Sequence, residues 1–182
     1  MLPALPAFLL LVLVPPDPAQ LKSELKRAPA ADVQQRFRIY DALAQAHVER
    51  KENDAAEEAF RNALELNRRL PQFDSNSGLR YAEFLAYQNR LSDCGRILSE
   101  ILRGEPRFVP AILLQARLLV AQNRRDDGIQ AAEKALALAE ETGPSFPSDR
   151  LAAIHLFLSV NYFAAGREDL SRVHQLWIQQ QR

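Results

Sequence analysis

The residues that could perform chemistry in this chain are few, and their spacing fits no catalytic or metal-binding pattern. Three histidines, His47, His155 and His174, form neither an HxxxH nor an HExxH spacing. The single cysteine, Cys94, completes no zinc set and excludes an intramolecular disulfide. Neither a GxSxG motif nor a phosphate-binding glycine-rich loop is present. The sequence therefore predicts a protein that is not an enzyme and holds no metal or cofactor.

Two pairs of adjacent carboxylates occur, at Glu57-Glu58 and at Asp126-Asp127. Neighbouring residues on a helix point about 100° apart, so the members of each pair do not converge on a shared proton. We expect both pairs to lie on solvated surfaces.

Composition narrows the fold and the kind of partner. The chain has 182 residues, with 23 basic and 23 acidic side chains and a formal net charge of zero. A protein that binds nucleic acid needs a basic surface to displace counterions, so this balance argues against such a partner. Only six glycines and no alternating β-branched runs are present, which argues against a sheet.

Residues 37–67 predict a hairpin of two amphipathic helices. Residues of one helical stripe recur at three- and four-residue steps, at Tyr40, Leu43, Ala44 and His47 in the first helix and at Ala56, Phe60, Ala63 and Leu64 in the second. Small side chains let two helix backbones approach closely while the larger ones fill the space around the contact. Neither helix can bury its apolar face alone.

The hairpin pattern returns three more times. Three sets of markers share the same steps of 38, 34 and 43 residues: Ala44, Ala82, Ala116 and Ser159; Lys51, Asn89, Asn123 and Gly166; and Ala63-Leu64, Ile101-Leu102, Ala135-Leu136 and Ile178-Gln179. Asn and Gly tolerate the left-handed conformation that a tight turn after a helix requires. In this register Cys94 takes the small position of Ala56, so we expect it to be a buried packing residue.

The repeating pattern resembles the tetratricopeptide repeat (TPR), a helix-turn-helix unit of about 34 residues. The resemblance implies an all-α fold, a right-handed α-α superhelix (solenoid) of about four repeats. We place a TPR-like domain at residues 32–182, with repeats near residues 37–70, 75–106, 109–142 and 149–182. Asp32 is the expected N-cap of the first long helix.

The closing helix has one apolar side and one polar side. The apolar side holds Leu170, Val173, Leu176 and Trp177, and the other holds Arg172, Gln175, Gln179 and Arg182. The last element of a stack needs a polar outer face, so we expect the apolar side to pack inward and the stack to be complete there.

The N-terminus predicts an export signal within residues 1–19. The apolar run at residues 2–14 would span roughly 20 Å as a helix, short of the roughly 30 Å core of a bilayer. It therefore fits a signal better than a stable membrane span, although no basic residue precedes it and Asp17 is unfavourable near a cleavage point after Ala19. We expect a bacterial protein that is exported to the periplasm or outside the cell; a cytoplasmic chain with a mis-chosen start or an inert tail is the alternative. Residues 20–31 are a charged linker or a short helix.

The resemblance implies that the first helices of the repeats line a concave face that binds a segment of another protein. Carried over position by position, this face comprises Asp41, Gln45, Glu49, Leu79, Glu83, Tyr87, Leu113, Arg117, Val120, Leu156, Val160 and Phe163. Chaperone-binding members hold a peptide carboxylate with Lys, Arg and Asn; here Asp41, Gln45 and Leu113 stand in the matching places, so that clamp is absent.

The function predicted from these residues is a non-catalytic scaffold or adaptor for protein–protein interaction. We expect the partner to dock on an exposed apolar patch at one end of the groove, formed by Leu113, Val120, Leu156, Val160 and Phe163. Four alternatives stay open: an accessory domain or subunit of an enzyme in another chain, binding of a small apolar ligand, a homodimer, and coverage of the patch by the loop that carries Phe146.

Overall fold

The computed structural model describes residues 16–181. These residues belong to two compact units, one that ends at Pro71 and one that begins at Gln72. The predicted export segment at residues 2–14 lies outside the described residues.

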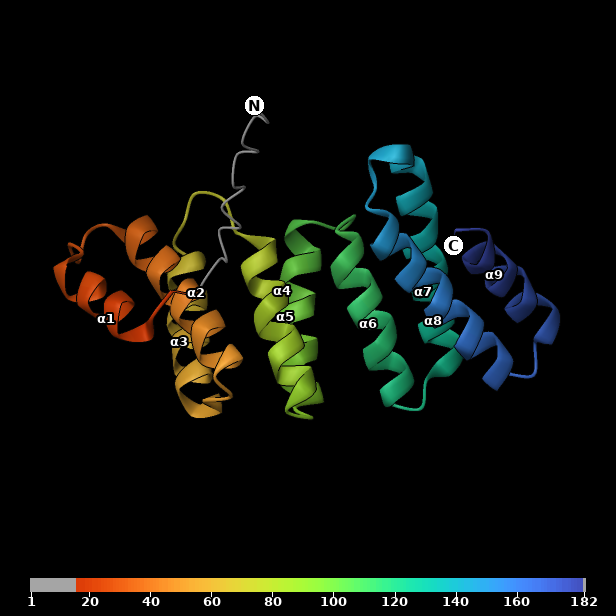
Figure 1. Ribbon diagram of the computed structural model, residues 1–182, viewed down its shortest axis with the longest axis horizontal. Coiled ribbons are helices and arrows are strands. Elements are labelled where there is room, and N and C mark those ends of the chain that lie inside the picture. Colours follow the sequence, from red (N-terminus) through yellow and green to blue (C-terminus); the bar gives the residue numbers. More distant parts are fainter. Residues whose placement is uncertain (1–15, 182) are drawn as a thin grey trace, which may run out of the picture. The chain divides into compact units, whose positions relative to one another are not determined.

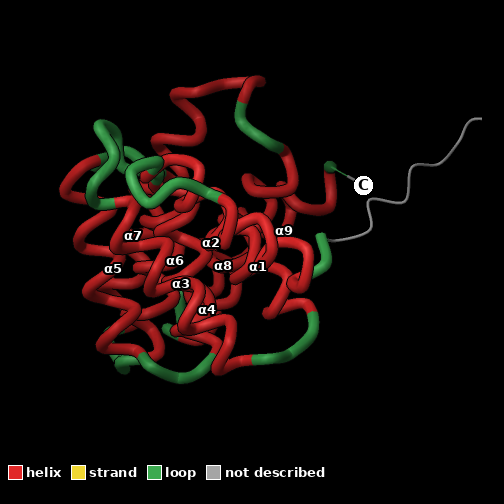
Figure 2. The backbone as a smooth tube through the Cα atoms, turned by 90° about the vertical axis from the view of Figure 1, so that its left-hand side faces the viewer, coloured by secondary structure: helices red, strands yellow, loops and turns green. Residues whose placement is uncertain are grey.

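All regular structure in the described part of the chain is helical (Figures 1 and 2). In chain order the elements are α1 (Pro18–Arg27), α2 (Val33–Glu49), α3 (Asn53–Asn67), α4 (Ser75–Tyr87), α5 (Leu91–Gly104), α6 (Val109–Ala121), α7 (Arg125–Thr142), the 3-10 helix η1 (Gly143–Ser145), α8 (Ser148–Ala164) and α9 (Glu168–Gln180). The all-α prediction and the pairing of helices into hairpins are confirmed.

In the first unit, α1 packs against α2, and α2 pairs with α3. Residues 20–27 are therefore helical, one of the two alternatives that the sequence left open. The Arg36 guanidinium of α2 donates hydrogen bonds of 3.4 Å to the carbonyl oxygens of Leu25 and Ala28. Asp32 caps α2 as predicted, because its carboxylate accepts a 2.9 Å hydrogen bond from the backbone N–H of Gln35.

The second unit contains three hairpins, α4 with α5, α6 with α7 and α8 with α9. Successive hairpins pack through α5 against α6 and through α7 against α8, and α4 also contacts α6 (Figure 1). The first helices α4, α6 and α8 are therefore the elements that hold the candidate binding residues of this unit.

The turn of each hairpin has the backbone conformation that the sequence predicts. The marker residues all have positive φ angles: 60° at Lys51, 58° at Asn89, 61° at Asn123 and 72° at Gly166. After each of these residues the backbone N–H bonds back to the carbonyl four positions before the marker, as Arg90 does to Leu85 at 2.9 Å. The repeat register is therefore correct at all four turns.

The small residues of the repeat lie at the contact between paired helices. Ala44, Ala82, Ala116 and Ser159 are buried in the first helices, and Ala56, Cys94, Gly128 and Ser171 are buried at the matching positions of the second. A Cβ atom added to Gly128 would lie 2.8 Å from the carbonyl oxygen of Ala116, so only glycine fits this crossing. Cys94 is fully buried, which confirms its predicted packing role.

The prediction for the closing helix is wrong for three of its four apolar residues. Leu170, Val173 and Leu176 are 40%, 60% and 50% exposed, whereas Trp177 stacks on His155 of α8. The face of α9 that packs on α8 instead carries Ser171, His174 and Trp177. The reason is the register itself, because the small position of the repeat falls on Ser171 and turns the neighbouring leucine and valine outward.

Candidate protein-binding surface

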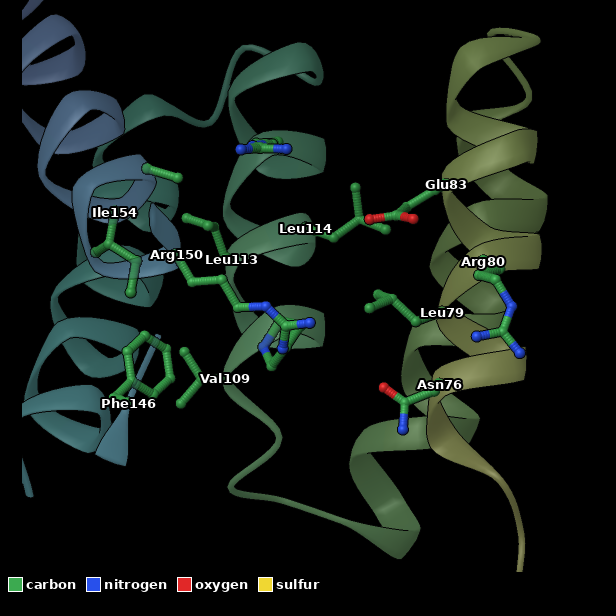
Figure 3. A pocket seen from close by; sticks show the side chains of 13 residues that line it. Asn76, Leu79, Arg80, Glu83, Val109, Leu113, Leu114, Phe146, Arg150 and Ile154 are labelled. Atoms are coloured by element: carbon green, nitrogen blue, oxygen red, sulfur yellow. The ribbon is translucent and has the colours of Figure 1, made fainter. Parts of the chain in front are cut away.

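A pocket of about 290 Å³ lies among α4, α6, α8 and the loop before α8 (Figure 3). Its lining comprises Asn76, Leu79, Arg80 and Glu83 from α4, Val109, Pro110, Leu113, Leu114 and Arg117 from α6, Phe146 from the loop, and Arg150, Ala153 and Ile154 from α8. The three first helices of the second unit thus contribute to one concave site.

The floor of this pocket is apolar. Val109, Leu113 and Ile154 are buried members of the core shared by α6, α7 and α8, and Phe146 packs against this core from the loop. In Figure 3 the Phe146 ring lies next to Val109 and Ile154. The helical spacing of Val109 and Leu113, four residues apart, places both on the face of α6 that the pocket uses.

The rim of the pocket is charged and mostly basic. Arg117 and Arg150 are exposed, and Glu83 lies among them and Arg80. Partial burial raises the pKa of the Glu83 carboxyl above its ordinary value of 4.5, whereas the charges of Arg117, Arg80 and Arg150 act in the opposite direction. In Figure 3 the Glu83 side chain leaves α4 towards α6, and Arg150 extends from α8 towards the middle of the pocket. Three guanidinium groups and one carboxylate give the rim a net positive charge.

An exposed apolar stripe continues from the pocket along α8. Ala153 lines the pocket, and Leu156, Val160 and Phe163 follow it at steps of three, four and three residues, which is one face of a helix. Their side chains are 57%, 57% and 63% exposed. We call Leu156, Val160 and Phe163 the α8 stripe. It lies next to the pocket, and the exposure of its apolar side chains to water is energetically unfavourable.

The structure brings together four of the predicted binding residues. Leu79, Glu83, Leu113 and Arg117 all line the pocket. Tyr87, at the end of α4, is exposed and does not line it. The expectation of one exposed patch with Leu113 and Val120 is wrong, because Leu113 is only 9% exposed and lies in the core.

Val120 faces its own hairpin rather than the groove. It is half-buried, and its Cγ2 methyl would lie 2.7 Å from a Cβ atom added to Gly128 of α7. The missing side chain at Gly128 makes room for this methyl group. The loop alternative is partly confirmed, since Phe146 packs against the core cluster that contains Leu113, whereas the α8 stripe stays exposed.

Three predicted residues lie on α2 in the first unit. Gln45 donates a 2.9 Å hydrogen bond from Nε2 to Oδ2 of Asp41, one turn earlier, and both Gln45 and Glu49 are exposed. This face of α2 is polar. The His47 ring, by contrast, is buried, and its Nδ1 lies 2.5 Å from Oε2 of Glu52.

The sequence analysis did not single out Arg80 or Arg150, and it named Phe146 only in the alternative that its loop covers the patch. Phe146 and Arg150 lie in or next to the loop that adds nine residues to the last repeat step, so the repeat register assigns them no place. Arg80 directly follows the predicted groove residue Leu79, so helical spacing alone could not assign it to the groove.

The described residues contain no group suited to metal chemistry. Within residues 16–181 no three His, Cys, Asp or Glu side chains lie close enough together to hold a metal ion. Burial raises the pKa of the Cys94 thiol to about 11, so this sulfur is a thiol rather than a reactive thiolate.

No helix in the described part of the chain has both the length and the apolar character needed to cross a bilayer.

The described chain is thus an array of antiparallel helix hairpins built on one repeated register. Residues 37–69 match the family model described as tetratricopeptide repeat. This match shows a tetratricopeptide repeat at residues 37–69, and the other helix hairpins share the fold of solved tetratricopeptide-repeat proteins. Proteins of this class generally mediate protein–protein interactions and are typically not catalytic. No curated protein sequence is significantly similar to the chain.

Solved structures share the fold at low sequence identity. BtubC (BKLC) from P. vanneervenii is similar with a TM-score of 0.80 at 16% identity, over 89% of this chain and 70% of that one. TTC0263, a thermophilic TPR protein in Thermus thermophilus, has a TM-score of 0.65 at 17% identity over 90% and 80% of the two chains. PilF of Pseudomonas aeruginosa has a TM-score of 0.65 at 16% identity over 88% and 70%. At these identities the likeness is one of fold alone.

Proposed function

We propose that this protein is a non-catalytic interaction module that binds a segment of a partner protein on the surface formed by α4, α6 and α8. The observation that carries the proposal is the direct continuation of an apolar-floored pocket into the exposed α8 stripe. Residues from three successive first helices converge there, which gives a partner segment a continuous track.

The physical reason is the exposure of bulky apolar side chains in register. Isolated exposed apolar residues are normal on protein surfaces, but Leu156, Val160 and Phe163 lie on one helical face and adjoin a concavity. A helix or an extended segment of another chain would remove these side chains from water.

The proposal is tested by the double substitution Val160→Asp and Phe163→Ser. Wild-type and variant proteins would be used as baits, the captured protein identified by mass spectrometry, and its binding repeated with the purified partner. The variant should lose the partner while its helical content, measured by circular dichroism, stays at the wild-type level. Charge placed on the α8 stripe cannot be buried without a large penalty.

A matched control is available on the neighbouring helix. Val173 and Leu176 of α9 are similarly exposed, so Val173→Asp with Leu176→Ser makes the same chemical change on another face. This control should retain the partner. Equal binding by all three folded proteins would place the interaction elsewhere, and loss of a dimer in the α8 variant alone would show that a second copy occupies the surface.

We also propose that the protein is exported from a bacterial cell. The support is the apolar run at residues 2–14 with the charged residues that follow it. Protein recovered from the cell envelope should begin near Gln20 by N-terminal sequencing, which means that Pro18 and Ala19, in the first turn of α1, are removed. A cytosolic chain that begins at Met1 would refute export and leave the binding proposal intact.

A further inference from the structure

We infer that the partner segment places an acidic side chain between Arg117 and Arg150 and lays nearby apolar side chains along the α8 stripe. This inference rests on the proposed function and adds to it the chemistry of the occupant. Three features of the surface support it: the charge of the rim, the continuity of the apolar track, and its length.

The charge of the rim favours an anionic group on an otherwise apolar occupant. Arg80, Arg117 and Arg150 outnumber the single carboxylate of Glu83, and all three act on that carboxylate. A guanidinium has five N–H donors in a fixed fork, so one arginine can bond a partner's carboxylate while it still faces Glu83. Attraction between such charges is stronger in a partly enclosed pocket than in open water.

The site also fits an apolar group next to the acidic one. Leu113 and Phe146 supply the floor beneath the arginines, and Ala153 connects the pocket to Leu156. A purely charged ligand such as inorganic phosphate would leave this apolar surface exposed to water, whereas an amphipathic segment covers it.

The length of the apolar surface from Ala153 to Phe163 limits how far apart the contacting residues of the partner can lie in its sequence. From Ala153 to Phe163 the helix rises by about 15 Å, and an extended chain covers that distance in about five residues. The acidic residue and the apolar residues of the partner should therefore lie within about five positions of one another.

The carboxylate belongs to a side chain within the segment rather than to a chain end. The pocket reaches from Asn76 and Leu79 on α4 across to Arg150 on α8. A segment that fills this width and then continues along the α8 stripe passes Arg117 and Arg150 with its interior.

Synthetic peptides with blocked ends test the inference directly. The probe is acetyl-Gly-Ser-Glu-Ser-Leu-Ser-Phe-Ser-Gly-amide, together with the same residues in reverse order, because the surface does not fix the direction of the bound segment. Matched peptides replace the Glu by Gln, or both apolar residues by Ser, and one further peptide has the Gln and a free C-terminal carboxylate. Binding of each peptide to the full chain would be measured by isothermal titration calorimetry.

At least one of the two acidic peptides should bind, and its Gln counterpart should bind about tenfold more weakly. Arg117→Gln and Arg150→Gln should each lower the affinity for the acidic peptide by a similar factor without changing the affinity for the Gln peptide. Arg172→Gln, which alters an exposed arginine of α9 outside the pocket, is the matched control and should change neither.

A variant that binds more tightly provides a test that damage to the fold cannot explain. Glu83→Gln removes the negative charge from the rim and should raise the affinity for the acidic peptide severalfold. Added salt should reduce this gain in affinity. Equal binding of the Glu and Gln peptides would overturn the inference while leaving the proposed peptide-binding function in place. Binding that needs the free terminal carboxylate, or no binding by a protein that still captures its partner through the α8 stripe, would also overturn it.

Discussion

The Nδ1 atoms of His155 in α8 and His174 in α9 lie 2.9 Å apart. One ring must donate and the other accept, so at least one Nδ1 carries no proton in this contact. Trp177 stacks on the His155 ring at a centroid distance of 3.9 Å, and Tyr162 stacks on the His174 ring at 5.7 Å. The Tyr162 hydroxyl in turn donates to Glu133 of α7, which ties three helices together.

This histidine pair should make the stability of the protein fall in mild acid. Burial, with a smaller contribution from His174, lowers the pKa of His155 from 6.5 to about 4. Between these pH values the unfolded chain binds more protons than the folded chain, so the free energy of unfolding decreases as the pH falls from 6.5 to 4. The loss should reach about 3 kcal/mol and then stop, because below pH 4 both states are protonated.

The measurement is chemical unfolding of the wild type and of His155→Phe at a series of pH values. Phenylalanine keeps a ring to stack on Trp177 but does not titrate. The wild type should therefore lose stability relative to His155→Phe as the pH falls. Burial also lowers the pKa of His174, but both proteins keep this residue, so their difference reports mainly on His155. A difference that is independent of pH from 7 to 4 would contradict the prediction.

The turn residue Lys51 offers a test of backbone strain. Its φ angle of 60° is left-handed, which costs an ordinary side chain about 1 kcal/mol or more. Lys51→Gly should therefore raise the free energy of unfolding by up to about 1 kcal/mol after the greater entropy of unfolded glycine is counted. Lys51→Ala keeps the strain and should have almost no effect, and equal stability of the Gly and Ala variants would refute the strain argument.

The single thiol should report on the packing of α4 against α5. Cys94 is fully buried at the small position of that hairpin, so Cys94→Ala should cost about 1 kcal/mol or less, whereas Cys94→Arg should unfold the second unit. In the native wild type the thiol should react with a disulfide reagent only as fast as the hairpin opens, because burial raises its pKa to about 11. Comparable melting curves for the two variants, or rapid native labelling, would refute the packing role.

The parts of the fold that the sequence predicted correctly are those set by backbone geometry. A tight turn needs a left-handed residue, and a close helix crossing needs a small one, so Asn89, Gly166 and Cys94 could be placed from spacing alone. Each of these constraints restricts the amino acid at a single position, so it can be recognised in the sequence.

The candidate site was less predictable because it depends on the rotation of each helix and on an irregular loop. Val120 and Val173 are apolar residues at helical spacing, yet one faces its own hairpin and the other faces solvent. The direction of Val120 follows from Gly128 on the facing helix, and that of Val173 follows from Ser171, which takes the small contact position two residues earlier on the same helix. Phe146 reaches the pocket through a loop that follows no repeat, and His155 meets His174 only after the hairpin has formed.

The contact between Gly128 and Val120 is tested by a double-mutant cycle. A Cβ at Gly128 would lie 2.7 Å from the Val120 Cγ2 and 2.8 Å from the Ala116 carbonyl oxygen, so Gly128→Ala should cost about 1–3 kcal/mol. Gly104→Ala is the matched control, because nothing lies within 4 Å of its added Cβ and alanine favours the helix by up to about 1 kcal/mol.

Val120→Ala removes the methyl group that the new side chain would meet. In the double variant the cost of Gly128→Ala should therefore fall by about 0.5 kcal/mol or more, although the contact with the rigid Ala116 carbonyl keeps the rescue incomplete. The cycle is measured by denaturant unfolding of the four proteins. Strict additivity would mean that Val120 does not pack on α7, and the side chain would then be free to face the groove as the repeat pattern first indicated.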